Sequence, residues 1–186
     1  GGLPLLNFPE ISMWGQSPWG GYGANPLPGR LQGRWNETKE KLSVGFPYSE
    51  GIYEDLNKVI CAQHYWAPDR TAMETVKEYI AFEFSPEVVD DVASVVKILE
   101  KNHFRNQSNN GIDDSTVTAY ELMERVDAKL TPQARRAWRW RILYLRGLID
   151  REMYKNSLGE AKAEVFQQAC DELIKIYHAE NTNTMM

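Results

Sequence analysis

The chain has 186 residues, enough for one domain with a substantial buried core, and its 42% apolar and 25% charged residues are ordinary values for a globular protein. The net charge of −5 argues against a nucleic-acid-binding protein, because contacts to phosphates need a basic face. No run of about 18 apolar residues occurs, so no segment is predicted to span a membrane.

The first 44 residues predict an irregular aromatic arm with one weak helix. Residues 1–29 are so rich in Pro and Gly that no helix is expected there, and only Glu10–Trp14 has the pattern of a short strand. Large aromatic residues, in which disordered tails are poor, are spread along this segment; they are Phe8, Trp14, Trp19 and Tyr22. We therefore expect the arm to be ordered by packing. Residues 30–42 predict a helix that Gly33 weakens.

A helical domain is predicted over residues 45–186, and it opens with a turn around Pro47. Ser49 is the expected N-cap of its first helix, which ends near Pro68. Three acids, Glu50, Glu54 and Asp55, follow where the helix dipole favours negative charge. Apolar residues then recur at three- and four-residue spacing, which indicates one buried face.

From residue 71 onwards one predicted helix follows another. The expected helices cover residues 71–84, 87–104, 115–130, 132–156 and 160–179. Their starts are marked by Asp69 or Thr71, by Ser85 and by Thr131, and the last two are followed by Pro at the first helical position. The sequence therefore predicts an all-α fold, with six to seven antiparallel helices in a bundle-like array behind the irregular Gly/Pro/Trp-rich arm.

The histidines and cysteines do not predict a metal site. His64, His103 and His178 fall on three different helices without a partner at metal-ligand spacing, so we expect structural or surface histidines, no metal and no cofactor. Cys61 and Cys170 lie far apart in the sequence; two buried thiols are expected, and a disulfide is the alternative in an oxidising compartment.

Basic residues are dense only on the predicted helix 132–156. The cluster consists of Arg135, Arg136, Arg139, Arg141 and Arg146. We interpret it as a solvated, ion-paired helix face rather than as a phosphate site, because short basic runs are weak evidence for anion binding.

Acidic residues are better candidates for chemistry. Two carboxylates that flank a bond can hydrolyse a glycoside, and Glu50, Glu54 and Asp55 lie close together in the sequence. Acids are also expected in a first helical turn for dipole reasons alone. We therefore favour capping over catalysis for this cluster.

Aromatic residues can stack on sugar rings or form the apolar side of an interface. The two interpretations are equally good for Trp14 and Trp19. For Trp35 and Trp66, which fall in or beside predicted helices, we expect packing in the core.

Three segments carry a family resemblance: ISMWGQSPWGGYGANPLP, GFPYSEGIYEDLNKVICAQHYWAPDRTAMETVKEYIAFEFSPE and RRAWRWRILYLRGLIDREMYKN. Together they resemble the C-terminal portion of glycoside-hydrolase-like proteins of gut Bacteroidetes. Those proteins are similar to α-glucuronidases and hexosaminidases in having a (β/α)₈ barrel followed by a helical domain. In them a YSEGIYED(I/L)NK segment follows the last barrel strands.

The resemblance implies that this chain is the helical C-terminal domain of a carbohydrate-active protein, and that residues 1–29 are the end of its barrel. Residues expected to line a sugar site at the C-terminal face of the barrel are Trp14, Trp19, Tyr22, Tyr48 and Glu50. None of them is expected to be catalytic, since catalytic carboxylates of such barrels come from earlier strands. The chain is then inactive alone, its partner is the barrel domain of the parent chain, and its location is periplasmic or extracellular. The alternative is a free-standing helical glycan-binding or protein-interaction module.

Overall fold

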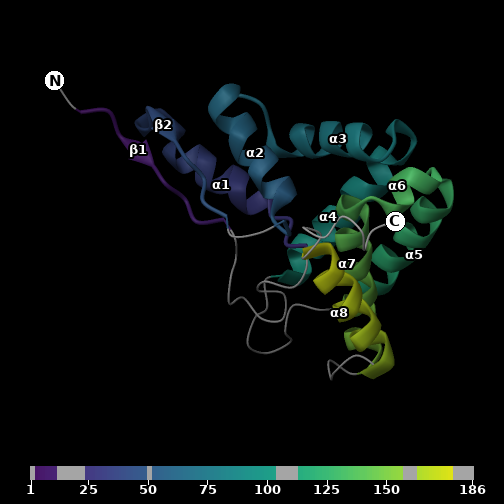
Figure 1. Ribbon diagram of the computed structural model, residues 1–186. Helices are drawn as coiled ribbons and strands as arrows, with labels where there is room; N and C mark the ends of the chain where they lie inside the picture. The colour runs from purple at the N-terminus through teal and green to yellow at the C-terminus, as the bar shows by residue number, and fades with distance from the viewer. Residues whose placement is uncertain (1–2, 12–23, 50–51, 104–112, 157–162, 178–186) are drawn as a thin grey trace.

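The computed structural model describes residues 3–11, 24–49, 52–103, 113–156 and 163–177. Within these ranges the protein consists of eight α-helices, two short 3₁₀ helices and one two-stranded sheet (Figure 1). The predicted all-α class is confirmed. No helix in the described ranges combines the length and the apolar character needed to cross a lipid bilayer.

Every helix expected within the described residues is present, with small shifts of its ends. The helices are α1 (Pro28–Thr38), α2 (Asp55–Trp66), α3 (Ala72–Glu83), α4 (Val89–His103), α5 (Ser115–Lys129), α6 (Pro132–Arg136), α7 (Trp138–Lys155) and α8 (Ala163–Tyr177), and the 3₁₀ helices are Lys39–Lys41 and Pro86–Val88. The described residues contain one more α-helix than the six to seven expected. The reason is Ala137, whose extended backbone (φ −61°, ψ 133°) breaks the predicted helix 132–156 into α6 and α7.

Side-chain caps fix several helix starts as predicted. The Thr71 hydroxyl accepts from the Glu74 amide in a capping box, and the hydroxyls of Ser85 and Thr131 accept from amides of the helical turns that they open. The prediction for Ser49 is wrong: α2 begins only at Asp55, and the Ser49 hydroxyl donates instead to Glu54 Oε2 at 3.1 Å. The N-cap position of α2 is Glu54, five residues after Ser49.

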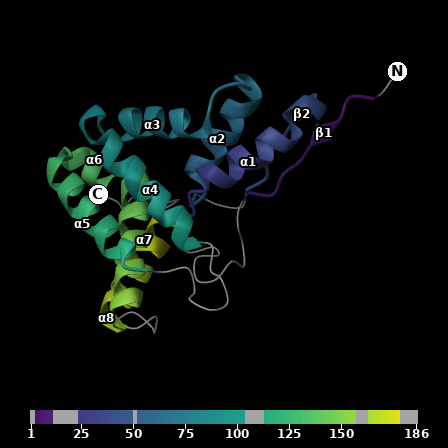
Figure 2. The same cartoon turned by 180° about the vertical axis from the view of Figure 1, so that it is seen from behind.

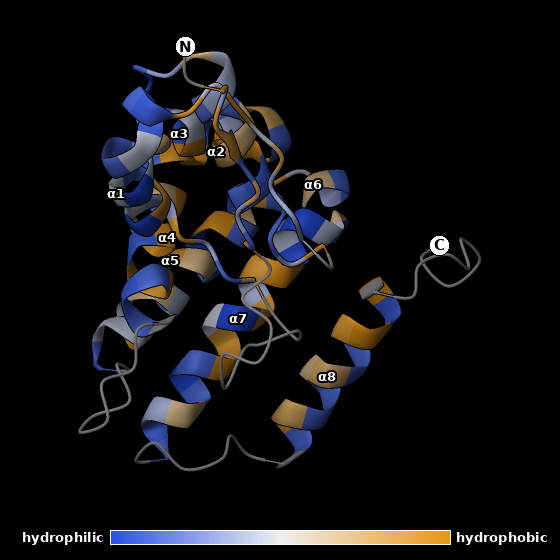
Figure 3. Ribbon diagram, turned by 90° about the vertical axis from the view of Figure 1, so that its left-hand side faces the viewer, coloured by the Kyte–Doolittle hydropathy of each residue, from blue (hydrophilic) through white to orange (hydrophobic). Residues whose placement is uncertain are grey.

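The core lies between α2, α3, α4, α5, α7 and α8, where the apolar stripes meet (Figure 3). Its large fully buried side chains include Trp140, Ile60, Leu99, Met123, Ile149 and Leu173. Trp35 is buried, as predicted, but the prediction for Trp66 is wrong because 87% of this residue is exposed. Trp66 is the last residue of α2 and lies two positions beyond the buried His64, which at 3.6 residues per turn places it on the opposite side of the helix.

The arginine cluster is only partly as predicted. Arg135, Arg139 and Arg141 form ion pairs with Asp127, Asp55 and Glu172, all with some exposure to solvent. Arg146 differs, because its side chain is fully buried and pairs with Asp150 one turn further along α7. The interpretation of the cluster as a solvated face is therefore wrong for Arg146.

Two short parallel strands accompany α1 at one end of the molecule (Figures 1 and 2). β1 (Leu6–Asn7) pairs with β2 (Val44–Gly45), and a further parallel bridge joins Glu10 to Tyr48. Of the strand expected at Glu10–Trp14, residues 12–14 lie outside the described residues. Because α1 lies between the strands in sequence, β1, α1 and β2 form a β-α-β unit, which we call the strand unit.

The strand unit has one covered and one open face. Partly buried and exposed residues alternate along both strands. The partly buried ones are Asn7, Pro9, Gly45 and Pro47, and the exposed ones are Leu6, Phe8, Val44, Phe46 and Tyr48. The covered face packs on α2, where Asn7 Nδ2 donates to the Tyr65 hydroxyl at 3.0 Å. α1 in turn packs against α2, α3 and α4. The predicted boundary between an arm over residues 1–44 and a helical domain over residues 45–186 stays a prediction.

Gly45 and Gly33 give a matched test of this packing. A Cβ on Gly45 would lie 2.0 Å from Tyr65 Cζ, so Gly45→Ala must displace the ring and break its bond to Asn7. We expect a loss of about 1–3 kcal/mol in the free energy of unfolding, measured with urea. A Cβ on Gly33, inside α1, would have no neighbouring atom within 4 Å, so Gly33→Ala should raise the free energy of unfolding by up to about 1 kcal/mol. An unchanged midpoint for Gly45→Ala would show that the strands do not pack on α2.

Candidate functional site

The carboxyl ends of β1 and β2 meet at one edge of the strand unit. β1 leads into Glu10 and β2 into Tyr48 and Ser49, and Glu54 immediately precedes α2. Ligands of parallel β/α folds bind outside the carboxyl ends of the strands, because the loops that follow the strands converge there. This edge is therefore the candidate functional site.

Tyr48 presents an open aromatic ring at this edge. Its amide donates to the Pro9 carbonyl at 2.8 Å and its carbonyl accepts from the Ile11 amide at 2.9 Å, which fixes its backbone. Its ring centroid lies 5.9 Å from that of Phe8, and 40% of the residue is exposed. A fixed, half-exposed ring beside a second aromatic ring offers a flat surface on which a sugar ring can stack.

Glu54 lies behind this edge and is only 2% exposed. Burial is the main reason why the pKa of its carboxyl rises from 4.5 to about 7, and the negative charge of Glu10 raises it further. The hydrogen bond from Ser49 and the positive charge of Lys58 oppose this rise. The side chain therefore changes its protonation near neutral pH.

A carboxyl of this kind resembles the general acid of a glycosidase, but its position does not suit that role. A general acid must come within hydrogen-bonding distance of the bond that it protonates. The Glu54 carboxyl is covered and held by Ser49, whereas the second acid, Glu10, is exposed. The arrangement suits the binding of a polar ligand better than acid catalysis.

Of the five predicted site residues, only Tyr48 lies within the described part of the chain, where it occupies the candidate site. Trp14, Trp19, Tyr22 and Glu50 lie outside the described residues, and their roles stay predictions. Sequence reasoning missed Glu10. The strand before it has two residues, which is too short to show a period of two, so no sequence signal pointed to Glu10.

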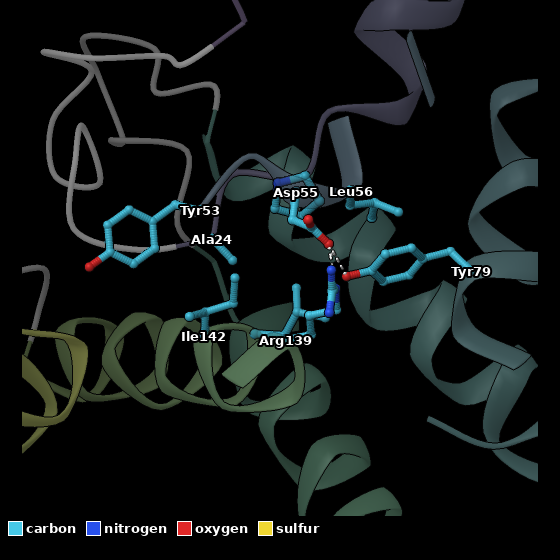
Figure 4. A pocket seen from close by; sticks show the side chains of 9 residues that line it. Ala24, Tyr53, Asp55, Leu56, Tyr79, Arg139 and Ile142 are labelled. Atoms are coloured by element: carbon cyan, nitrogen blue, oxygen red, sulfur yellow. Dashed lines mark hydrogen bonds and ion pairs between the residues drawn. The ribbon is translucent and has the colours of Figure 1, made fainter. Parts of the chain in front are cut away.

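Asp55, the other acid of the predicted cluster, belongs to a structural ion pair (Figure 4). Its Oδ2 accepts from Arg139 Nε and from the Tyr79 hydroxyl, both at 2.8 Å, and Glu83 lies 3.6 Å from Arg139. The adjoining cavity measures about 10 Å³, which is space for a single water molecule. The ion-paired cluster joins α2, α3 and α7, and the cavity beside it is too small to hold a ligand larger than water.

A larger cavity of about 290 Å³ lies on the covered side of the strand unit. Its polar lining includes Asn7, Glu10, Arg30, Arg34 and Asn57. An adjoining hollow of about 50 Å³ shares part of this lining and is bounded by His64, whose ring stacks on Trp35 at 5.2 Å. The buried Nε2 of His64 has no hydrogen-bond partner among the described residues, and burial lowers its pKa.

The described residues contain no cluster of three His, Cys, Asp or Glu side chains that could hold a metal ion. Cys61 is a buried free thiol, and burial raises its pKa to about 11. Cys170 is also a free thiol but is partly exposed, so the expectation of two buried thiols is wrong for this residue. The thiol of Cys61 is thus protonated near neutral pH and is a poor nucleophile.

Glu54 predicts a specific dependence of stability on pH. Because its folded pKa exceeds its unfolded value, the folded carboxyl keeps a proton that the unfolded one loses between about pH 4.5 and 7, so its contribution to stability falls as pH rises through that interval. The free energy of unfolding of Glu54→Gln minus that of the wild type, measured with urea, should therefore rise by about 2–3 kcal/mol from pH 5 to pH 8. The exposed Glu40→Gln controls for the loss of one negative charge. A gain that is the same at both pH values would contradict the raised pKa.

None of the family models, curated proteins and solved structures compared with the chain matches it.

Proposed function

We propose that this chain is the C-terminal helical domain of a carbohydrate-active, glycoside-hydrolase-like protein. It supports a (β/α)₈ barrel of the parent chain and contributes residues to the sugar site of that barrel. The observation that carries the proposal is the strand unit, in which helices cover one face of two parallel strands and the other face is apolar and open.

Parallel strands seldom occur as an isolated pair. Parallel sheets normally have both faces covered, and a lone pair of strands is marginally stable in water. Here the exposed face carries Leu6, Phe8, Val44, Phe46 and Tyr48 instead of polar side chains. Such a face fits the inside of a larger parallel sheet, which supports a β/α partner domain.

The carboxyl ends of the strands supply the sugar-binding part of the proposal. Tyr48 offers a ring for stacking, and the neighbouring Glu10 offers an exposed carboxylate that can accept hydrogen bonds from sugar hydroxyls. Trp14, Trp19 and Tyr22 follow β1 in the sequence, and Glu50 follows β2. We include these four residues as proposed further contacts with the sugar.

The chain itself is proposed to bind but not to hydrolyse. Glu54 is buried, so the catalytic pair is assigned to the barrel domain of the parent chain. An assay of the isolated chain on a panel of aryl glycosides should show no turnover above blank. A carbohydrate-active protein of the type that the sequence motifs resemble acts outside the cytoplasm, so we propose a periplasmic or extracellular location.

A free-standing glycan-binding module is the second candidate, and the 290 Å³ cavity favours it. This volume is close to the lower end of the range for small-molecule sites, and the lining combines Arg30 and Arg34 with amide side chains. In that case the sugar would bind behind the strands, beside Asn7 and Asn57, although Glu10 lines both places. Variants of the two places separate the candidates.

Tyr48→Ala should weaken the binding of oligosaccharides to the chain by about fivefold, because stacking on one ring contributes on the order of 1 kcal/mol. Isothermal titration with ligands chosen from a glycan panel measures the change. Trp66→Ala, which removes an even more exposed aromatic side chain at the end of α2, is the control and should bind as the wild type. Loss of binding in Asn7→Ala together with unchanged binding in Tyr48→Ala would favour the cavity and contradict the proposal.

A further inference from the structure

The small hollow behind the strand unit is lined by a buried polar atom that the fold leaves without a partner. His64 of α2 lines this hollow and is only 3% exposed, and its Nε2 makes no hydrogen bond with the described residues. Its ring is held by stacking on Trp35, with the ring centroids 5.2 Å apart and the planes within 7° of parallel. Because a buried nitrogen without a partner costs free energy, the hollow is expected to hold a group that bonds to it.

Two further side chains bring hydrogen-bond donors to the same hollow. The Tyr65 hydroxyl accepts from Asn7 Nδ2 at 3.0 Å, and no acceptor for its own hydrogen occurs among the described residues. Burial raises the pKa of this hydroxyl, so it keeps that hydrogen at neutral pH. Arg34 of α1 uses Nη1 for an exposed ion pair with Glu37 at 3.1 Å, a weak interaction that leaves its other nitrogens available.

The charge of the lining differs between the hollow and the larger cavity beside it. None of the described residues that line the hollow is an acid, and Arg34 gives it positive charge. The larger cavity carries opposite charges, because Arg30 and Glu10 both line it. Only the hollow therefore selects for charge, and its donors favour a ligand group that is negative and accepts hydrogen bonds.

The sizes of the two spaces set the kind of ligand. The hollow measures about 50 Å³, and since one water needs about 10–15 Å³, it has room for a few waters or for a carboxylate group. The larger cavity of about 290 Å³ shares Leu31 and Arg34 with the hollow and adds the apolar side chains of Ile11 and Leu27. A molecule with one acidic end and a less polar remainder fits this pair of spaces.

We propose that the hollow and the cavity together bind a small organic acid, whose carboxylate enters the hollow beside Arg34, His64 and Tyr65 and whose remainder lies in the larger cavity. The guanidinium fork of Arg34 matches the two oxygens of a carboxylate. Tyr65 donates its free hydrogen, and His64 donates when Nε2 carries the proton of the ring. This site lies behind the strands, apart from the Tyr48 ring, and does not depend on the proposed function.

The test titrates the chain with acetate, benzoate and succinate, each beside its neutral amide, while NMR follows the ring signals of His64. At least one acid should shift these signals saturably and bind at least tenfold more tightly than its amide, because the amide lacks the charge-assisted hydrogen bonds. Arg34→Gln should weaken the binding of that acid at least tenfold. Arg136→Gln, which removes an exposed arginine of α6 outside the site, is the matched control and should change it less than twofold.

Other results would overturn the inference in distinguishable ways. If no acid shifts the His64 signals, the hollow holds water alone, and if Arg34→Gln binds as the wild type, the acid lies elsewhere. Equal binding of an acid and its amide assigns the cavity to a neutral ligand, as the glycan-binding module requires. Inorganic phosphate that binds more tightly than every acid assigns the hollow to a phosphate group. In each case the Tyr48 experiment still decides sugar binding at the strand ends independently.

Discussion

A buried guanidinium connects the strand unit to the helical scaffold. Arg146 of α7 is fully buried and pairs with Asp150 at 3.0 Å. Its Nη1 donates to the carbonyl of Ala24 at 2.7 Å and to Asn25 Oδ1 at 3.1 Å, and its Nη2 donates to the carbonyl of Leu99 in α4 at 3.4 Å. A buried charge is tolerated only when it is paired and hydrogen-bonded, so this geometry fixes the segment before α1 against α4 and α7.

The same segment determines where α1 begins. Asn57 of α2 donates to the Asn25 carbonyl at 2.6 Å and accepts from the Leu27 amide at 2.9 Å. The first amides of α1, those of Gly29 and Arg30, donate to the Glu100 carboxylate of α4 at 2.9 and 2.8 Å. α1 then leads through the 3₁₀ helix Lys39–Lys41 into β2, which pairs parallel to β1. The contacts made in the interior thus fix the start of the helix that connects the two strands.

The helical part of the fold could be predicted from the sequence because its signals are local. Thr71 and Thr131 cap helices, and apolar residues repeat at helical spacing over many turns. The burial of Arg146 could not be predicted, since it lies in a run with other arginines that pair near the surface and its partners at residues 24, 25 and 99 are distant in sequence. The break at Ala137 also carries no Pro or Gly signal.

The candidate site was less predictable than the helices. Two-residue strands are too short to show a period of two, so the β1–β2 pairing had no sequence signal. Tyr48 was predicted through the family resemblance, and the structure places it at the strand ends. The burial of Glu54 depends on packing around the start of α2, which acidic residues in a predicted first turn do not reveal.

A double-mutant cycle between Arg146→Met and Asn25→Ala tests most directly whether the buried guanidinium holds the two parts of the protein together. Free energies of unfolding are measured with urea for the wild type, both single variants and the double variant. The account predicts that the two residues are coupled by about 1 kcal/mol or more, as directly contacting groups usually are. Additive effects, with a coupling energy of zero within error, would contradict it.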